Sequence, residues 1–289
     1  MSDHRPDWLK KRLSLDNNVI KEVKSLIEES NLHTVCQSAN CPNIFECFSK
    51  RSATFLLMGD RCSRNCAFCS IDSKKTLPLD ENEPVNIGIT ASKMGLRYVV
   101  LTSVTRDDIA DGGAQHFSLT VKEIKKRIPG CLIECLIPDF GGNKESLRTI
   151  VSQPISVLNH NIETIERNYS KIRPGADYRA SLEILKEAKK IKKGLYTKSG
   201  FMVGLGETMD EVGLLLKDLH EVDCDMVTIG QYLSPTRNNI NVTKYYSNEE
   251  FEELRELAEM AGIKNVISGA FVRSSYKASL LLKKAAEGK

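Results

Sequence analysis

Short apolar runs rich in strand-forming residues alternate with helical patterns over most of this 289-residue chain, and this alternation limits the folds open to it. Helical patterns follow Thr208 and Ser247, where capping-box sequences open them. A strand–helix unit roughly every 30 to 45 residues predicts an α/β fold, a partial or complete (β/α) barrel. A doubly wound open sheet has the same alternation, so periodicity leaves both architectures open. The predicted strands are residues 53–58, 98–104, 132–137, 155–159, 196–203, 226–229 and 266–270.

Residues 1–52 do not follow the alternation. They are predicted to form an N-terminal extension, with a short amphipathic helix over residues 19–27 and cysteine-bearing loops after it. Residues 53–270 are predicted to form the barrel, and residues 271–289 a short C-terminal extension. We expect the N-terminal segment and the tail after Tyr276 to lie over the mouth of the barrel.

Composition excludes several classes of protein. The chain is 41% apolar and 27% charged, as in ordinary globular proteins, and its net charge of +3 is spread along the chain, so no nucleic-acid partner is expected. The charged start has no signal-peptide pattern and no run of 18 apolar residues occurs, so we expect a cytoplasmic protein with no membrane partner. Nine cysteines in such a chain indicate metal or redox chemistry rather than disulfides.

Three of the cysteines, Cys62, Cys66 and Cys69, follow the first predicted strand with three and then two residues between them. Three thiolates this close in sequence hold three irons of a four-iron cluster and leave one iron open. Zinc is the alternative, but structural zinc takes four ligands, and no second pair or nearby histidine follows. The spacing, with Phe68 before the last cysteine, resembles the CxxxCxxC signature of the radical S-adenosylmethionine (SAM) superfamily. The resemblance implies a barrel of the radical SAM type whose open iron binds SAM, which is cleaved to a 5′-deoxyadenosyl radical.

A second triad lies upstream, where Cys36, Cys41 and Cys47 have four and then five residues between them. The spacing matches no common zinc finger; chance clustering of buried thiols is the alternative to a second metal centre. Near the other end of the chain stands Arg273-Ser274-Ser275-Tyr276. Both triads and this RSSY element, in this order, are similar to the lipoyl synthase family, whose pattern is CxxxxCxxxxxC, CxxxCxxC and RSSY.

This resemblance implies a second 4Fe–4S cluster held by the upstream triad and by a serine of RSSY, Ser275 in preference to Ser274. It further implies a sulfurtransferase that inserts two sulfur atoms, at C6 and C8, into a protein-bound octanoyl group, with the second cluster consumed as sulfur donor. The implied partners are an octanoylated lipoyl-carrier domain, a flavodoxin- or ferredoxin-type reductant and an iron–sulfur cluster delivery protein. Without the cysteine triads, the two serines are an ordinary polar turn.

Polar residues at or just after the predicted strand ends are candidates for binding the ammonium, carboxylate and ribose of SAM, because barrel active sites lie at the carboxyl ends of the strands. Each also fits a loop-capping role, and Arg173, a candidate carboxylate ligand, also fits a solvated surface position. We expect the loops beginning at Thr105, Pro138, His160 and Gly204 to converge on one mouth. The SAM candidates are Thr102, Ser103, Asn161, Glu163, Lys198 and Arg173.

The remaining cysteines, Cys131, Cys135 and Cys224, are assigned to the core, and the histidines to hydrogen-bonded or solvated positions. Two other functions stay open at this point. One is another radical SAM sulfurtransferase, similar to biotin synthase; the upstream triad and RSSY count against it. The other is a non-catalytic iron–sulfur electron carrier, which does not explain the barrel-like alternation.

Overall fold

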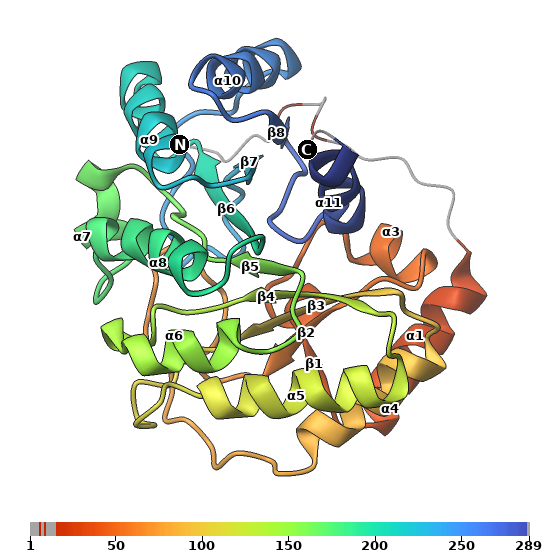
Figure 1. The fold of residues 1–289 in the computed structure, drawn as a ribbon. Coiled ribbons are helices and arrows are strands. Elements are labelled where there is room, and N and C mark those ends of the chain that lie inside the picture. The colour runs from red at the N-terminus through yellow and green to blue at the C-terminus, as the bar shows by residue number, and fades with distance from the viewer. Residues whose placement is uncertain (1–5, 7–8, 10–15, 288–289) are drawn as a thin grey trace.

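The computed structural model describes residues 6, 9 and 16–287, and its centre is one curved eight-stranded sheet in the order β1 to β8 (Figure 1). Strands β2 to β8 are parallel and each pairs with its neighbours in the sequence. Each predicted strand is confirmed, with ends that differ by two residues or fewer. The strands are β1 His33–Thr34, β2 Thr54–Leu57, β3 Tyr98–Ser103, β4 Leu132–Leu136, β5 Val157–Asn159, β6 Tyr196–Val203, β7 Met226–Gln231 and β8 Asn265–Gly269.

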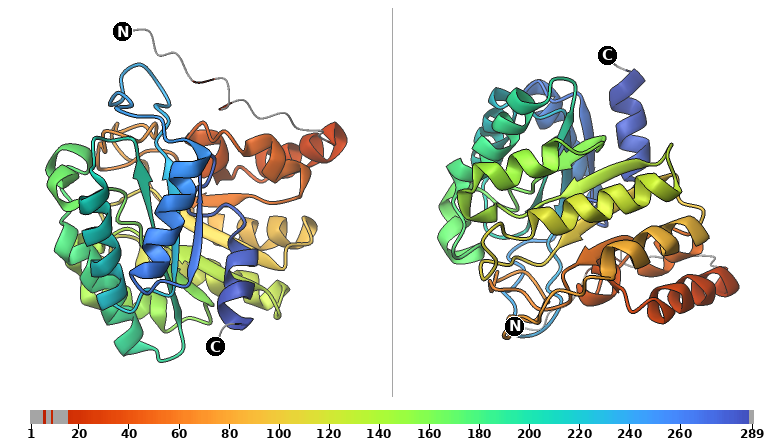
Figure 2. Two further views of the ribbon diagram at one scale, coloured as in Figure 1. Left: turned by 90° about the horizontal axis from the view of Figure 1, so that it is seen from above. Right: turned by 60° about the horizontal axis from the view of Figure 1, so that its bottom comes forward.

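Helices join the strands and cover the outer face of the sheet (Figures 1 and 2). Both predicted capping boxes are present, with Thr208 and Ser247 as the N-cap residues of α9 and α10. The helices are α1 Asn17–Glu29, α2 Val35–Ser38, α3 Ile44–Ser49, α4 Glu83–Lys93, α5 Ala114–Arg127, α6 Lys144–Val151, α7 Tyr169–Ile172, α8 Tyr178–Ile191, α9 Met209–Glu221, α10 Asn248–Met260 and α11 Ala278–Glu287, with the short 3-10 turns η2 Phe140–Gly142 and η3 Glu166–Asn168.

The order of the strands decides between the two architectures. A doubly wound sheet reverses its strand order at a switch point, whereas these strands run in sequence order throughout. In the described part of the chain β8 pairs with β7 and β1 with β2, with no pairing between the two edges. The fold is therefore a partial (β/α) barrel, and the predicted α/β class is confirmed.

The N-terminal extension contributes a strand that was not predicted. His33 and Thr34 pair antiparallel with Leu56 and Phe55 at the edge of the sheet. A two-residue strand has no periodicity to detect. The predicted helix over residues 19–27 is confirmed as the longer α1. The division of the chain after residues 52 and 270 stays a prediction.

The C-terminal helix lies elsewhere than expected. Leu281, Leu282 and Ala285 of α11 form a buried cluster with Met226, and the partly buried Tyr196 packs against it; these are the first residues of β7 and β6. The first residues of parallel strands mark the amino end of a barrel, opposite its active-site mouth. The prediction that the tail after Tyr276 covers the mouth is therefore wrong: α11 closes the other end. Apolar side chains on one face of a helix are buried wherever a matching apolar surface is free.

Among the residues that the structure describes, no helix combines the length and the apolar character needed to cross a lipid bilayer.

Candidate active site

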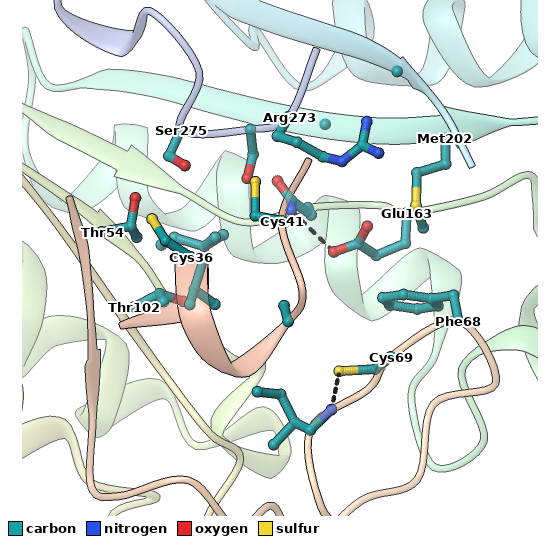
Figure 3. A pocket seen from close by; sticks show the side chains of 18 of the residues that line it. Cys36, Cys41, Thr54, Phe68, Cys69, Thr102, Glu163, Met202, Arg273 and Ser275 are labelled. Carbon is teal, nitrogen blue, oxygen red and sulfur yellow. Dashed lines mark hydrogen bonds between the residues drawn. The ribbon is translucent and has the colours of Figure 1, made fainter. Parts of the chain in front are cut away.

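A cavity of about 420 Å³ opens at the carboxyl ends of the strands, and all six clustered cysteines line it (Figure 3). In Figure 3, Cys36, Cys41 and Ser275 point into one part of the cavity and Cys69 into another. Ser274 also lines the cavity. The structure thus brings both predicted triads and the RSSY serines to one site, from segments more than 200 residues apart. The other three cysteines are buried outside it, as predicted; they are Cys131, Cys135 and Cys224.

The loop that carries Cys62, Cys66 and Cys69 follows β2 and is held by backbone contacts on several sides. The amides of Thr105 and Arg64 approach the Cys62 sulfur at 3.3 and 3.4 Å, and the amide of Ile71 approaches the Cys69 sulfur at 3.4 Å. Amide donors directed at sulfur stabilise a thiolate, and hydrogen bonds of this kind also tune iron–sulfur clusters. The loop therefore fixes the positions of the Cys62 and Cys69 sulfurs.

Arg64, inside this loop, clamps it to the loops that follow β3 and β4. Its guanidinium donates to both carboxylate oxygens of Asp107 at 2.8 and 2.9 Å and to both of Asp139 at 2.5 and 2.8 Å. Paired bidentate contacts fix both direction and distance. The carboxylates raise the pKa of Arg64 against the opposing effect of burial, so the clamp stays charged.

The cavity chemistry fits a cationic iron–sulfur centre. Burial raises the pKa of Cys36 and Cys69 to about 12 and that of Cys66 to about 11, while Arg173 opposes the shift at Cys66. Buried thiols of this kind stay protonated unless a cation replaces the proton. Among the described residues, no three His, Cys, Asp or Glu side chains are close enough to share one ion. Each cysteine of a cubane instead binds its own iron, so sulfurs spread around a cavity suit a cluster.

Five of the six SAM candidates line the cavity, namely Thr102, Ser103, Asn161, Glu163 and Arg173. The Ser103 hydroxyl and the Asn161 amide oxygen are buried without a hydrogen-bond partner in the described part of the protein. Buried polar atoms without partners are costly, and a polar ligand in the cavity would satisfy them. The cavity therefore offers a place for a molecule with the polar groups of SAM.

Lys198 is the exception. Its side chain is fully buried within the barrel, away from the cavity lining, and its ammonium lies 2.9 Å from a carboxylate oxygen of Glu134. An ammonium already paired in this way has no contact with the cavity. The structure therefore does not bring Lys198 to the cavity with the other candidates, because its ammonium is paired with Glu134 inside the barrel.

Glu163 and Arg173 form a charged corner of the cavity. Arg173 donates to the backbone carbonyl of Asn161 and to the Tyr169 hydroxyl, both at 2.8 Å, so it is held in the site and is not a solvated surface residue. Burial raises the pKa of Glu163, with Arg173 opposing the shift. Glu163 has a φ of 67°, in the left-handed region that non-glycine residues seldom adopt, and such strain gathers at functional sites.

His160 begins one of the loops predicted to reach the mouth, but its role as a polar residue of the site was not predicted. Its Nδ1 lies 2.9 Å from the carbonyl oxygen of Ile137, which only accepts, so Nδ1 carries the proton. Burial lowers the pKa of His160 to about 4, so the ring is neutral, and Nε2 is an acceptor without a partner among the described residues. His160 lines the cavity, where a donor group of a ligand would satisfy it. The only signal in the sequence was its place directly after a strand.

One predicted loop does not reach the cavity. The loops beginning at Thr105, Pro138 and His160 contribute to its lining, whereas Gly204 to Glu207 do not. The Glu207 carboxylate instead accepts from the amides of Gly204 and Leu205, at 2.6 and 2.9 Å, and closes this loop on itself.

Comparisons with known proteins agree with this arrangement. The sequence profile of the Radical SAM superfamily matches residues 56–219. Among solved structures, HydG, a maturase of the FeFe-hydrogenase, aligns with a TM-score of 0.61 at 14% identity, covering 92% of this chain and 67% of that one. Methylornithine synthase aligns with a TM-score of 0.56 at 16% identity, covering 94% and 81%. The fold, the CxxxCxxC loop and the profile define a radical SAM enzyme.

Curated relatives give the particular family. Lipoyl synthase of Caldanaerobacter subterraneus subsp. tengcongensis is 49% identical over 97% of this chain and 98% of its own length. Lipoyl synthases of Caldicellulosiruptor saccharolyticus and Coxiella burnetii are 50% and 49% identical over 96% of this chain, and over 97% and 88% of their own lengths. The chain belongs to the lipoyl synthase family, whose cofactors are SAM and two 4Fe–4S clusters. This membership decides against a biotin synthase-like enzyme and a simple electron carrier.

Proposed function

We propose that this protein inserts two sulfur atoms, at C6 and C8, into an octanoyl group carried on a lipoyl-carrier domain. The observation that supports the proposal best is the single cavity lined by both cysteine triads and Ser275. Cys62, Cys66 and Cys69 would hold the cluster that binds SAM, and Cys36, Cys41, Cys47 and Ser275 the second cluster. When bound there, these groups supply a radical that removes hydrogen from carbon, and sulfide for the new C–S bonds.

The chain's own residues bind and orient the reactants. Arg173 offers a fixed guanidinium for the carboxylate of SAM, and Glu163 accepts a hydrogen bond from an ammonium or a hydroxyl. Ser103, Asn161 and His160 present unpaired polar atoms to the remaining polar groups of SAM. Thr102 completes this polar wall.

Apolar side chains cover another wall of the cavity. Phe68 and Met202 pack against a buried cluster of Ile172, Leu205 and Tyr232. A wall of this kind suits an eight-carbon acyl chain and keeps water away from a carbon radical. The octanoyl group would therefore have an apolar surface to lie on within the cavity, formed by Phe68, Met202 and Tyr232.

The proposal includes three partners: an octanoylated carrier domain, a flavodoxin- or ferredoxin-type reductant and an iron–sulfur cluster delivery protein. The first is the substrate; the second would supply electrons, and the third would replace consumed iron and sulfide. A cytoplasmic location is part of the same proposal.

Anaerobic reconstitution tests the proposed function. We expect about eight irons per chain, SAM cleavage on reduction and two sulfurs added to an octanoylated peptide, measured by iron assay and mass spectrometry. About four irons per chain, or SAM cleavage with no sulfur insertion, would contradict the proposal.

Replacing Ser275 tests its role as a ligand of the second cluster. We expect Ser275→Ala to lower sulfur insertion by at least about tenfold, because loss of even an outer partner of a metal ligand costs 10- to 100-fold. SAM cleavage, which depends on the other triad, should persist. Ser274→Ala is the matched control, and a larger loss in that variant would transfer the role to Ser274.

Replacing Arg173 tests the proposed carboxylate contact. Arg173→Gln removes a charge-assisted pair and should raise the KM for SAM by about tenfold or more. Arg179→Gln, which alters an exposed arginine paired with Glu166 and Asp218, is the control. An unchanged KM in Arg173→Gln would remove this residue from the SAM site.

A further inference from the structure

Two segments from opposite ends of the chain meet at the second triad. One is the cysteine loop, which here means residues 41–47, including the start of α3 and the cysteines Cys41 and Cys47. The other is the serine turn, residues 271–276. The Asn43 side-chain amide donates to the Phe271 carbonyl at 2.6 Å, and the Tyr276 hydroxyl lies 3.2 and 3.3 Å from the two carboxylate oxygens of Glu46. The serine turn is therefore joined to the cysteine loop near both of its ends, with Ser275 between the joints.

Asn43 donates to the Phe271 carbonyl instead of capping its own helix, α3. It is the N-cap residue of α3, yet it has φ −98° and ψ 0° and makes no side-chain cap hydrogen bond. Asn143, the N-cap of α6, has an extended backbone, and its side chain accepts hydrogen bonds from the amides of Glu145 and Ser146, as an N-cap residue normally does. A side-chain cap contributes about 1 kcal/mol to a helix. A residue that forgoes it for a contact 228 positions away marks a functional constraint.

The second joint is a tyrosine hydroxyl that donates to a carboxylate. Glu46 is itself buried in the first turn of α3 and is also paired with Lys50 at 2.8 Å. Because α3 also carries Cys47, the position of this helix is linked directly to the serine turn.

The serine turn is stiff between the two joints. The amide of Val272 donates to Gly269 at 3.0 Å, and the amide of Tyr276 donates to Arg273 at 2.9 Å. A Cβ at Gly230 would lie 2.2 Å from the Val272 carbonyl oxygen, so β7 packs directly against this backbone. These contacts hold the backbone of the turn in place around Ser275.

Ser275 also lines a second cavity of about 440 Å³ beside the first residues of β3, with Lys50, Arg97 and Lys277 among the other lining residues. The residue therefore lines both the reaction cavity and this second cavity. Loosening the serine turn would open the second triad to small molecules from this side.

We propose that Asn43 and the Tyr276–Glu46 pair form a latch that positions Ser275 on the second cluster and keeps this cluster from being lost before it is used. The latch rests on the proposed two-cluster function. These three are positioning residues, since they act through the turn and the loop that carry the ligands.

Asn43→Asp is the most informative variant, because aspartate caps a helix as well as asparagine does but cannot donate to the Phe271 carbonyl. We expect reconstituted Asn43→Asp and Tyr276→Phe enzymes to release iron of the second cluster to a chelator about fivefold faster, the factor that ~1 kcal/mol for a lost hydrogen bond represents. The SAM-binding cluster, followed by its own spectroscopic signal, should be retained. Hydrogen exchange of the amides in residues 271–276 should also accelerate, while that of residues 62–69 stays unchanged.

Tyr178→Phe is the matched control, because it removes a tyrosine–carboxylate contact of 2.8 Å, to Asp218, outside the cavity. Iron release and exchange at wild-type rates in Asn43→Asp and Tyr276→Phe would overturn the latch and leave the proposed function intact. Equal loss of both clusters would also overturn it, as a general effect on folding. A wild-type enzyme with only about four irons would instead overturn the proposed function, and the latch with it.

Discussion

Replacing Cys36 with alanine should abolish the lipoyl product while SAM cleavage continues. Cys36 lines the cavity on the side of Ser275, and burial raises its pKa to about 12, so it depends on a bound metal to become a thiolate. In the proposed assignment the second cluster then loses one of its three cysteine ligands, whereas Cys62, Cys66 and Cys69 are untouched. We expect iron to fall from about eight to about four per chain, with 5′-deoxyadenosine still formed.

Cys224→Ala is the control for this variant, because Cys224 is buried but lies outside the cavity. It should keep both clusters and the product. Sulfur insertion by Cys36→Ala, or loss of SAM cleavage together with the product, would contradict the division of labour between the two triads. The first outcome would show that Cys36 is dispensable, and the second that the two centres do not assemble independently.

Most of the barrel was predictable because buried parallel strands appear in a sequence as apolar runs separated by turn residues. The strand Tyr196–Val203 was predicted without error at either end. The two-residue β1 was not predictable, since its pairing with β2 depends on tertiary contact alone. The position of α11 was missed for a similar reason: an amphipathic pattern shows that a helix is buried on one face but not against which surface.

The site was predictable where ligands lie close together in the sequence. The spacing of Cys62, Cys66 and Cys69 was enough to predict an iron–sulfur cluster. That the upstream triad meets Ser275 was predicted only from the family resemblance. Neither the cysteine spacing nor the family resemblance shows how deep in the barrel a given side chain lies. Lys198 and Gly200 are two residues apart and so share a face of β6, yet only Gly200 lines the cavity.

Replacing Lys198 with methionine should destabilise the protein strongly without affecting SAM binding. The side chains of Lys198 and Glu134 are fully buried, and the carboxylate also accepts from Asn159 at 2.8 Å and from the Tyr98 hydroxyl at 2.6 Å. Removing the ammonium leaves a buried carboxylate without its countercharge, which costs about 3–5 kcal/mol. The free energy of unfolding, measured by chemical denaturation of the metal-free protein, should fall by that amount.

A second substitution separates the charge from the packing. Glu134→Gln in the Lys198→Met background removes the uncompensated charge, keeps an oxygen that accepts from Tyr98 and offers an amide nitrogen to the Asn159 amide oxygen, so it should restore at least half of the lost stability. Lys190→Met, which breaks an exposed pair with Glu187, should cost less than about 1 kcal/mol. If Lys198→Met cost no more than this control, the buried pair would not stabilise the barrel. If it raised the KM for SAM in a folded, reconstituted enzyme, Lys198 would return to the list of candidate SAM contacts.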